Sequence, residues 1–368
     1  MPSPLRDISM KKSLVGSLIL LLGLLWAQNP QREKFQLVHA DKLYLSNTAM
    51  GQILELTGRV NFFYGDTEFS GHRALILDAQ KIARISGNVV VQNDSLHLQA
   101  DSLAYYRKTD VINLGGRAKI TQNRKDAPQR WMQGDHAIYD MGKEQFTAWG
   151  RVKAYDEEER AQIDCGYGFW DRKKGYSYLL EEPEVRIGDP ENLRVKADKM
   201  ELFEEDKSLV ASFNVNSFHQ DYHVTSDFLI YFDKEEKAVF LGQPRFENDF
   251  ALAQAQEFHL YFEDGEVSRA VLADSSLVYF ASEEGEEKVN WVKASNIELS
   301  FEEGKIMDFS ADSNVSYYFQ QDKDDKKDYF ENRAEGQVLK AKFDSDNKLQ
   351  IMDMGGRIKG TYVFENDS

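Results

Sequence analysis

The chain has 368 residues and a formal net charge of −17, with 17 Tyr and 23 Phe against only 7 Pro. The acidic balance excludes nucleic acid as a partner, because the phosphate backbone repels such a surface. The single cysteine, Cys165, excludes an internal disulfide bond, and the aromatic content favours β structure over disorder.

The first expected element is a signal peptide over residues 1–27. Two lysines precede an apolar run at 14–26, and Ala27 ends this run before a polar stretch. That order is typical of an exported protein, and the run is shorter than the roughly 20 residues of a membrane helix. Leu25 stands where cleavage prefers a small residue, so an uncleaved anchor is the alternative.

Residues 28–368 are predicted to form one repeat domain in which two short motifs alternate. In the first motif a polar residue precedes apolar residues at the second and fourth following positions, with clear copies at Asp41, Asp101, Asp135, Asp198 and Asp227. The second motif is Gly-x-Val or a close variant, with clear copies at Gly58, Gly87, Gly116 and Gly150.

The spacing between the motifs is regular. Asp101 to Gly116 and Asp135 to Gly150 are 15 residues each, and Gly87 to Asp101 is 14 residues. A period of about 29 residues built from two similar halves indicates a stacked array. Polar turn sequences separate the halves, as at 233–236, so each repeat is predicted to be a hairpin.

We therefore predict an all-β fold, an elongated antiparallel β-jellyroll of about ten stacked hairpin repeats preceded by a signal-peptide helix. Two sheets would face each other with their apolar sides. With one layer per hairpin in each sheet, the body would span about 50 Å at ~4.8 Å per strand. A parallel β-helix is the alternative, since it also stacks apolar columns, but the regular hairpin turns favour the antiparallel array.

Two irregularities interrupt the pattern. The unit at 160–190 lacks the usual motifs, which predicts a bend or a sub-domain junction there. Three connections carry extra polar residues, at 122–130, 282–288 and 321–328. All three join a second motif to the next first motif, so they are expected to project from the same edge of the array.

Apolar residues alternate within the predicted strands, which places them on one face. The residues predicted to line the interior, and to contact lipid if the chain carries one, are Leu43, Leu45, Val60, Phe62, Leu75, Leu77, Val89, Val91, Leu103, Tyr105, Ile120 and Tyr139. They could line an open groove or fill a packed core, and the sequence is compatible with both.

Other candidate sites are weaker. His219, Asp221 and His223 would share one face of a strand, as a metal site requires, but a polar outward row explains them as well. The repeated aspartates are interpreted as acceptors for backbone N–H groups at turns. We find no phosphate-binding loop, nucleophile elbow or paired acids, and expect neither an enzyme nor a metal or cofactor.

The alternation of Ala-Asp-x-Leu-x-Tyr, as at 100–105, with Gly-Asn-Val-x-Val at 87–91 resembles the OstA-like family, which includes the lipopolysaccharide transport protein LptA and the periplasmic part of LptD. The resemblance covers roughly residues 36–360. It implies a periplasmic jellyroll that shields the acyl chains of lipopolysaccharide in an apolar groove. It also implies end-to-end strand pairing with other jellyroll subunits and contact with inner- and outer-membrane transport components. This chain has more units than a short LptA.

The leading hypothesis is a periplasmic lipopolysaccharide-binding bridge that serves outer-membrane assembly. The alternative is a non-catalytic envelope scaffold, or a partner module of the LptD or LptC kind, whose sheets are closed and carry no lipid. Acyl lipid bound to the purified protein would distinguish the two.

Overall fold

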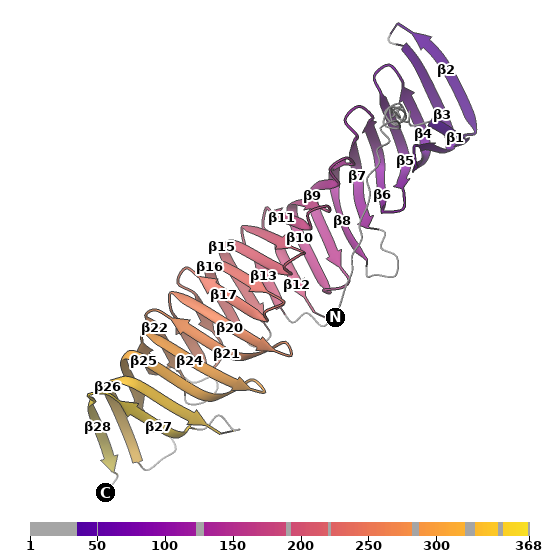
Figure 1. Cartoon of the computed structure of the whole chain (residues 1–368). Helices are drawn as coiled ribbons and strands as arrows, with labels where there is room; N and C mark the ends of the chain where they lie inside the picture. The colour runs from indigo at the N-terminus through magenta and orange to yellow at the C-terminus, as the bar shows by residue number, and fades with distance from the viewer. Residues whose placement is uncertain are drawn as a thin grey trace, which may run out of the picture.

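The computed structural model describes residues 35–49, 51–122, 129–188, 193–219, 222–281, 287–320, 328–344 and 349–366. All regular elements in these ranges are β-strands, and together they form one elongated array (Figure 1). None of the described residues belongs to a helix capable of crossing a membrane. The predicted signal peptide, residues 1–27, lies outside the described residues.

The first part of the array consists of long strands: β1 (Phe35–His39), β2 (Lys42–Thr48), β3 (Gly51–Tyr64), β4 (Thr67–Leu77), β5 (Ile82–Gln92), β6 (Leu96–Tyr106), β7 (Val111–Gln122), β8 (Arg130–Asp140), β9 (Gln145–Asp156) and β10 (Ala161–Asp171). Shorter strands follow in the middle: β11 (Tyr176–Leu180), β12 (Glu184–Ile187), β13 (Leu193–Lys196), β14 (Lys199–Phe203), β15 (Ser208–His219), β16 (Tyr222–Phe232), β17 (Lys237–Leu241), β18 (Arg245–Glu247), β19 (Ala251–Gln254) and β20 (Glu257–Glu263). The array ends with β21 (Glu266–Ala273), β22 (Ser276–Phe280), β23 (Asn290–Ala294), β24 (Asn296–Glu302), β25 (Lys305–Gln320), β26 (Asp328–Phe343), β27 (Leu349–Gly355) and β28 (Lys359–Asn366).

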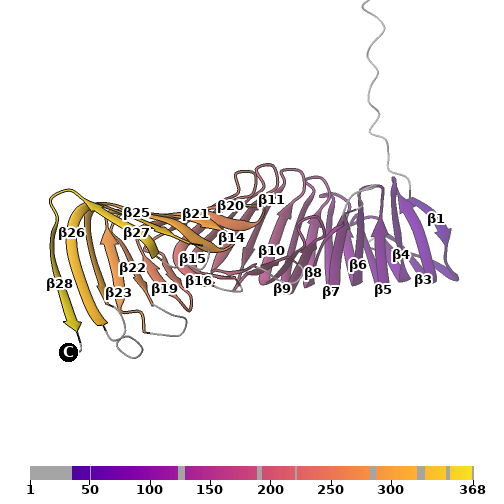
Figure 2. The same cartoon turned by 90° about the horizontal axis from the view of Figure 1, so that it is seen from below.

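Every strand pairing is antiparallel, and consecutive strands are neighbours along most of the array, as β4, β5 and β6 show. The strands lie across the long axis (Figure 2). This confirms the predicted antiparallel jellyroll and excludes the parallel β-helix. The predicted turns are present, for example at 78–81, 107–110 and 233–236.

Each long strand is bent in its middle. In β5 the pairing register shifts between Ser86 and Val89. The two residues between them, Gly87 and Asn88, have φ angles of 81° and 48°, and Gly150 and Arg151 in β9 have 75° and 48°. Two consecutive left-handed residues add one unpaired residue and re-aim the strand, as a β-bulge does.

These bends, here called corners, fold the array into two facing sheets. Sheet A contains the strand halves joined by turns 78–81, 107–110 and 141–144, and sheet B contains those joined by turns 93–95 and 157–160. Each long strand, or each pair of short strands separated by a corner, crosses both sheets, so each hairpin adds two layers to each sheet. The expected length of 50 Å is therefore wrong, and the body spans roughly twice that at ~4.8 Å per strand.

From β11 onward the corner often separates two short strands instead of bending one. Strand β10 pairs with β9 on one side and with both β11 and β12 on the other, so the hydrogen-bonded array continues from Ala161 to Ile187. The missing motifs correspond to this change of corner, with Glu181 and Glu182 in the left-handed region. The predicted bend or sub-domain junction itself stays a prediction.

The three long connections join strand ends on the same edge. Gln122 pairs with Arg130, Phe280 with Asn290, and Gln320 with Glu331, and all of these residues lie at the edge of sheet B. The flanking strands thus agree with the predicted common edge. Residues 123–128, 282–286 and 321–327 lie outside the described residues.

Candidate functional site

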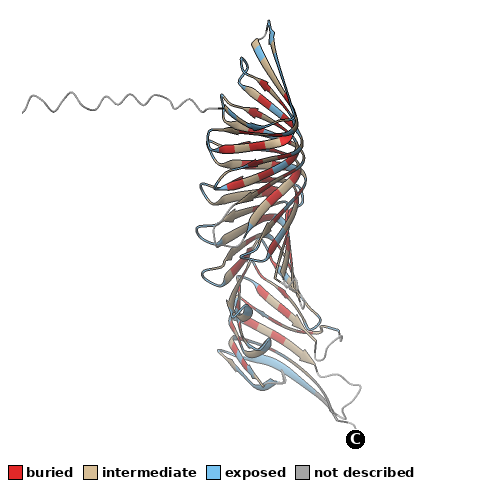
Figure 3. Ribbon diagram, turned by 90° about the vertical axis from the view of Figure 1, so that its right-hand side faces the viewer, coloured by how far each residue is buried: buried red, intermediate tan, exposed pale blue. Residues whose placement is uncertain are grey.

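The main candidate site is the interior between sheets A and B. Buried side chains alternate with more exposed ones along the strands, so one face of each sheet forms a continuous apolar column (Figure 3). Most of the predicted lining residues lie in this column and are buried: Val60, Phe62, Val89, Val91, Leu103, Tyr105, Ile120 and Tyr139. The column extends along the array as one cluster.

Four predicted lining residues lie elsewhere. Leu75 and Leu77 are half-buried on the outer face of β4, whereas Ala74 and Ile76 point inward. The predicted inward placement of these two leucines is wrong. The motif begins at His72, so its second and fourth following positions are 74 and 76.

Leu43 and Leu45 are at the correct positions of their motif but are more than half exposed. They lie in β2, the first strand of sheet A, and among the described residues this strand pairs with β3 alone. Their predicted burial is wrong because, within the described part of the chain, β2 is the outermost layer of sheet A at this end.

Aromatic rings bridge the two sheets near the N-terminal end. The Phe69 ring centroid lies 5.3 Å from that of Phe62 within sheet B, and 5.4 Å from that of Tyr105 in sheet A. Side chains of this kind fill the space between the sheets, and Phe62, Phe69 and Tyr105 are almost completely shielded from solvent. A hydrocarbon chain entering here has to part the sheets or displace these rings.

Several interior residues were missed by the sequence prediction. Phe146, Leu179, Met200 and Ile297 are fully buried in sheet A, and Trp170 is nearly so. Phe146 lies four residues before Gly150, on the strand half that precedes a corner. Counting backward from each corner glycine in steps of two would have identified it.

A row of ion pairs runs along the corners. Arg151 donates to Asp135 at 2.6 Å, and Arg59 donates to Asp41 at 2.7 Å. A further pair joins Arg117 to Asp101. Asp41, Asp101 and Asp135 therefore bind an arginine at a corner, so their interpretation as turn acceptors for backbone N–H groups is wrong. Asp198 accepts a hydrogen bond of 2.8 Å from the Asn214 side chain instead.

These contacts shift the acidity of the carboxyl groups. The hydrogen bond from Arg117 lowers the pKa of Asp101, and the hydrogen bond from Arg151 lowers that of Asp135. A carboxyl whose pKa is lower in the folded than in the unfolded state stabilises the fold above the unfolded pKa. That contribution is lost as the pH falls through the folded pKa.

We therefore expect the thermal unfolding midpoint of the protein to fall below about pH 4, where aspartate begins to protonate in the unfolded state. A double substitution Asp101→Asn and Asp135→Asn should lower the midpoint at pH 7 and make its acid dependence shallower. The exposed turn residue Asp66 provides the control, as Asp66→Asn. Parallel pH curves for the double variant and the parent would contradict the assignment.

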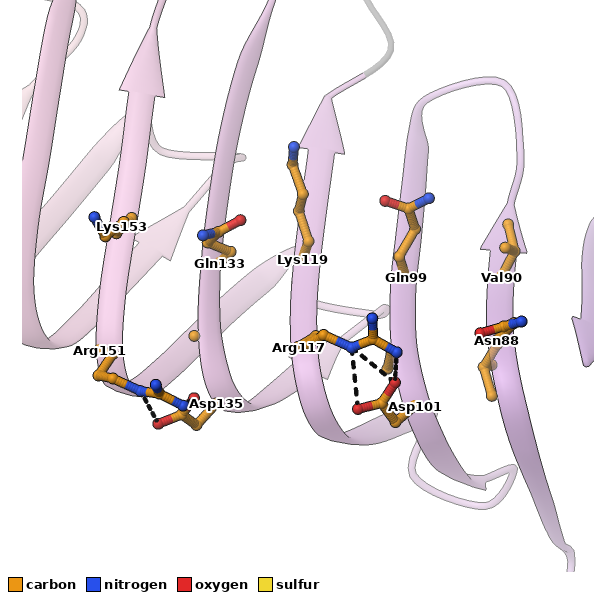
Figure 4. A pocket seen from close by; sticks show the side chains of 13 residues that line it. Asn88, Val90, Gln99, Asp101, Arg117, Lys119, Gln133, Asp135, Arg151 and Lys153 are labelled. Carbon is orange, nitrogen blue, oxygen red and sulfur yellow. Dashed lines mark hydrogen bonds and ion pairs between the residues drawn. The ribbon is translucent and has the colours of Figure 1, made fainter.

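A shallow depression lies on the outside of sheet B beside the corners (Figure 4). The cationic side chains that line this depression already have partners within the protein. Arg117 and Arg151 bind the corner aspartates, Lys153 lies 3.3 Å from Asp164, and Lys119 lies over the Trp131 ring. The depression therefore shows paired surface charges rather than a site with charge left for an anionic ligand.

The candidate metal row does not lie on one strand. His219 ends β15 and pairs with Tyr222 at the start of β16, so the chain reverses between the two histidines. His219 stacks on Tyr222, and His223 lies 3.3 Å from Asn216. Asp221 lies outside the described residues, among which no group of three metal-binding side chains is found.

Cys165 is buried at the corner of β10, and burial raises the pKa of its thiol to about 12. A neutral, buried thiol is a poor nucleophile. We assign it a packing role.

An antiparallel array folded along a row of corners into two facing sheets, with a continuous apolar interior, defines an open-ended β-jellyroll repeat protein. Residues 68–163 match the family model described as LptA/(LptD N-terminal domain) LPS transport protein, which confirms the resemblance to the OstA-like and LptA family. No curated protein matches the chain.

Among solved structures, the chain is similar to LptH from Pseudomonas aeruginosa, described as the LptA homologous periplasmic component of the lipopolysaccharide transport device. The sequences are 14% identical, and the match covers 33% of this chain and 94% of that one with a TM-score of 0.30.

Proposed function

We propose that this lipopolysaccharide transport-associated protein is a periplasmic bridge that binds the acyl chains of lipopolysaccharide, or of a similar lipid, between its two sheets. The observation that carries the proposal is the apolar column that continues from layer to layer along the array. Each CH₂ group exposed to water costs roughly 0.8 kcal/mol, so an acyl lipid needs such a column to cross an aqueous space. Near-equivalent layers also let the chains move without meeting a deep energy minimum. The role is non-catalytic.

The two ends of the array support the bridge. Among the described residues, strands β2 and β28 are each paired along one edge, and the other edge is a template for strand addition. Exposed apolar side chains gather at these ends: Val38, Leu43, Tyr44 and Leu45 at the first, and Leu349, Ile351, Met352, Ile358, Tyr362 and Val363 at the second. Another jellyroll subunit or a membrane-anchored transport component that adds a strand would cover them.

The closed interior favours a second candidate, the envelope scaffold without lipid. Residues such as Val60, Phe62 and Ile120 are shielded from solvent without any lipid present. A scaffold would use the same ends to bind partners and would keep its sheets packed. The two functions differ in whether lipid reaches the interior.

Photocrosslinking from adjacent positions distinguishes them. Phe62 points into the interior, while Phe63 lies on the outer face and pairs with Glu68. A photoreactive phenylalanine at position 62 should crosslink to acyl lipid in the native envelope at least about tenfold more than one at 63. Tyr105 and Tyr106 form the same inward and outward pair on β6.

The control is the outward position of each pair, which tests for nonspecific contact with lipid. Equal yields at inward and outward positions, together with purified protein that contains no extractable acyl lipid, would support the scaffold. The bridge predicts crosslinks at both inward positions and lipid in the extract.

A further inference from the structure

The two sheets meet along two edges of very different construction. At one edge the corners join them covalently, strand by strand. At the other edge each sheet ends in a row of turns, here called rim A and rim B. Rim A contains turns 107–110, 172–175 and 204–207, and rim B contains turns 93–95 and 157–160. Only noncovalent contacts join the rims, along a line that we call the seam.

Glu204 of rim A makes the central contact across the seam. Its carboxylate lies 2.9 Å from the guanidinium of Arg130, which begins β8 on rim B. Arg130 is held in place on its own rim by Asp156 at 2.6 Å. Glu204 also accepts a hydrogen bond of 3.2 Å from the indole N–H of Trp170, an interior side chain of sheet A. The ion pair is thus connected to the apolar core.

Two further contacts cross the seam on either side. Lys207 of rim A lies 3.2 Å from Glu159 of rim B. Arg172 of rim A donates to the backbone carbonyl of Ser95 of rim B at 3.2 Å, and to the Tyr139 hydroxyl at 3.2 Å. The Arg172 side chain is only 5% exposed, which is unusual for an arginine.

The contacts across the seam all connect the two rims in the same direction along the chain. In each case the residue on rim A comes later in the chain than its partner on rim B. Arg107 of rim A, which lies over the Tyr64 ring at the end of β3, follows the same rule. The contacts across the seam therefore all run in the same direction along the chain, and the rims face each other from Tyr64 to Lys207.

We propose that Arg130–Glu204, Lys207–Glu159 and Arg172–Ser95 form a clasp that holds the rims together, and that its release opens the side of the array to a hydrocarbon chain. The inference rests on the proposed lipid-binding function, since it names the residues that control access to the same interior. The corners cannot open without unfolding strands, whereas the seam opens by breaking a few side-chain contacts. Ion pairs that are partly exposed are weak enough to open reversibly.

The test compares a closed clasp with a released one. In a Cys165→Ala background, the pair Glu159→Cys and Lys207→Cys is joined by a short bismaleimide, which locks rim A to rim B. The matched control is Glu205→Cys and Lys234→Cys, which lie on adjacent turns of rim A and already make contact.

The released form carries Glu204→Gln and Lys207→Gln. Uptake of a pyrene-labelled fatty acid is measured for each, with spin-label distances between Arg160→Cys and Asp206→Cys across the seam.

We expect the locked protein to take up the fatty acid about tenfold more slowly than the same-rim control. The released form should take it up roughly fivefold faster, the factor that about 1 kcal/mol gives, and should show a broader distance distribution. Equal uptake by the locked and control proteins overturns the clasp while leaving lipid binding intact. If no form takes up the fatty acid, the proposed function fails, and an unchanged spin-label distance in the released form would overturn the clasp independently.

Discussion

Replacing Phe146 by alanine is expected to lower the free energy of unfolding by about 3–5 kcal/mol, the cost of removing a fully buried aromatic ring. The Phe146 side chain has no solvent exposure and packs toward Tyr139, with ring centroids 6.5 Å apart. The two sheets are joined covalently at the nearby corner, so they cannot move together to fill the cavity that the missing ring leaves. Urea unfolding followed by circular dichroism measures the change.

The matched control is Ile138→Ala on the neighbouring strand β8. Ile138 is 37% exposed on the outer face of sheet A and pairs with Thr147, the residue after Phe146. Its replacement should cost less than about 1 kcal/mol. Similar losses for the two variants would mean that the interior of the array is not its core.

The second large effect is expected at a corner. Gly150 has a φ angle of 75°, and a Cβ atom added there would lie 2.9 Å from a carboxylate oxygen of Asp135. Gly150→Ala therefore combines left-handed backbone strain with displacement of the aspartate that binds Arg151. We expect a loss of about 2–3 kcal/mol in the free energy of unfolding.

Gly265→Ala separates the two contributions. Gly265 lies in a rim turn with a φ of 84°, and nothing lies within 4 Å of an added Cβ atom. Only the backbone cost of roughly 1–2 kcal/mol remains there. Equal losses at Gly150 and Gly265 would show that the close approach of Asp135 does not constrain the corner.

The fold was predictable from the sequence because the same residue types recur at the same structural positions in each repeat. Glycine and aspartate recur at the positions where each strand turns from one sheet to the other, and the turn residues recur at the rims. The role of the aspartates was not predictable in the same way. A motif start resembles a strand start, and only the continuous pairing of strands such as β5 and β6 shows that the chain passes through the corner without stopping.

The candidate site was partly predictable. Alternation placed Val89, Val91 and Ile120 in the interior. In β4 the prediction selected Leu75 and Leu77, although Ala74 and Ile76 are the residues that point inward. Leu43 and Leu45 are exposed because β2 is the outermost described layer of sheet A at this end, and a local pattern does not encode the position of a repeat in the array. The clasp was beyond prediction, since Glu159 and Lys207 are 48 residues apart and meet only across the seam.

Because the strands lie across the long axis, the hydrogen bonds between them lie along it (Figures 1 and 2). A pull applied to the two termini of such a body loads the ladders in series, so the weakest ladder determines the tension that the whole body bears. The three-residue strand β18, Arg245–Glu247, pairs through only three residues with each of its neighbours, so its ladders are among the shortest in sheet B. If the protein acts as the bridge proposed above and is held at both ends, we expect it to part at such a ladder under tension and to re-form there once the tension is released.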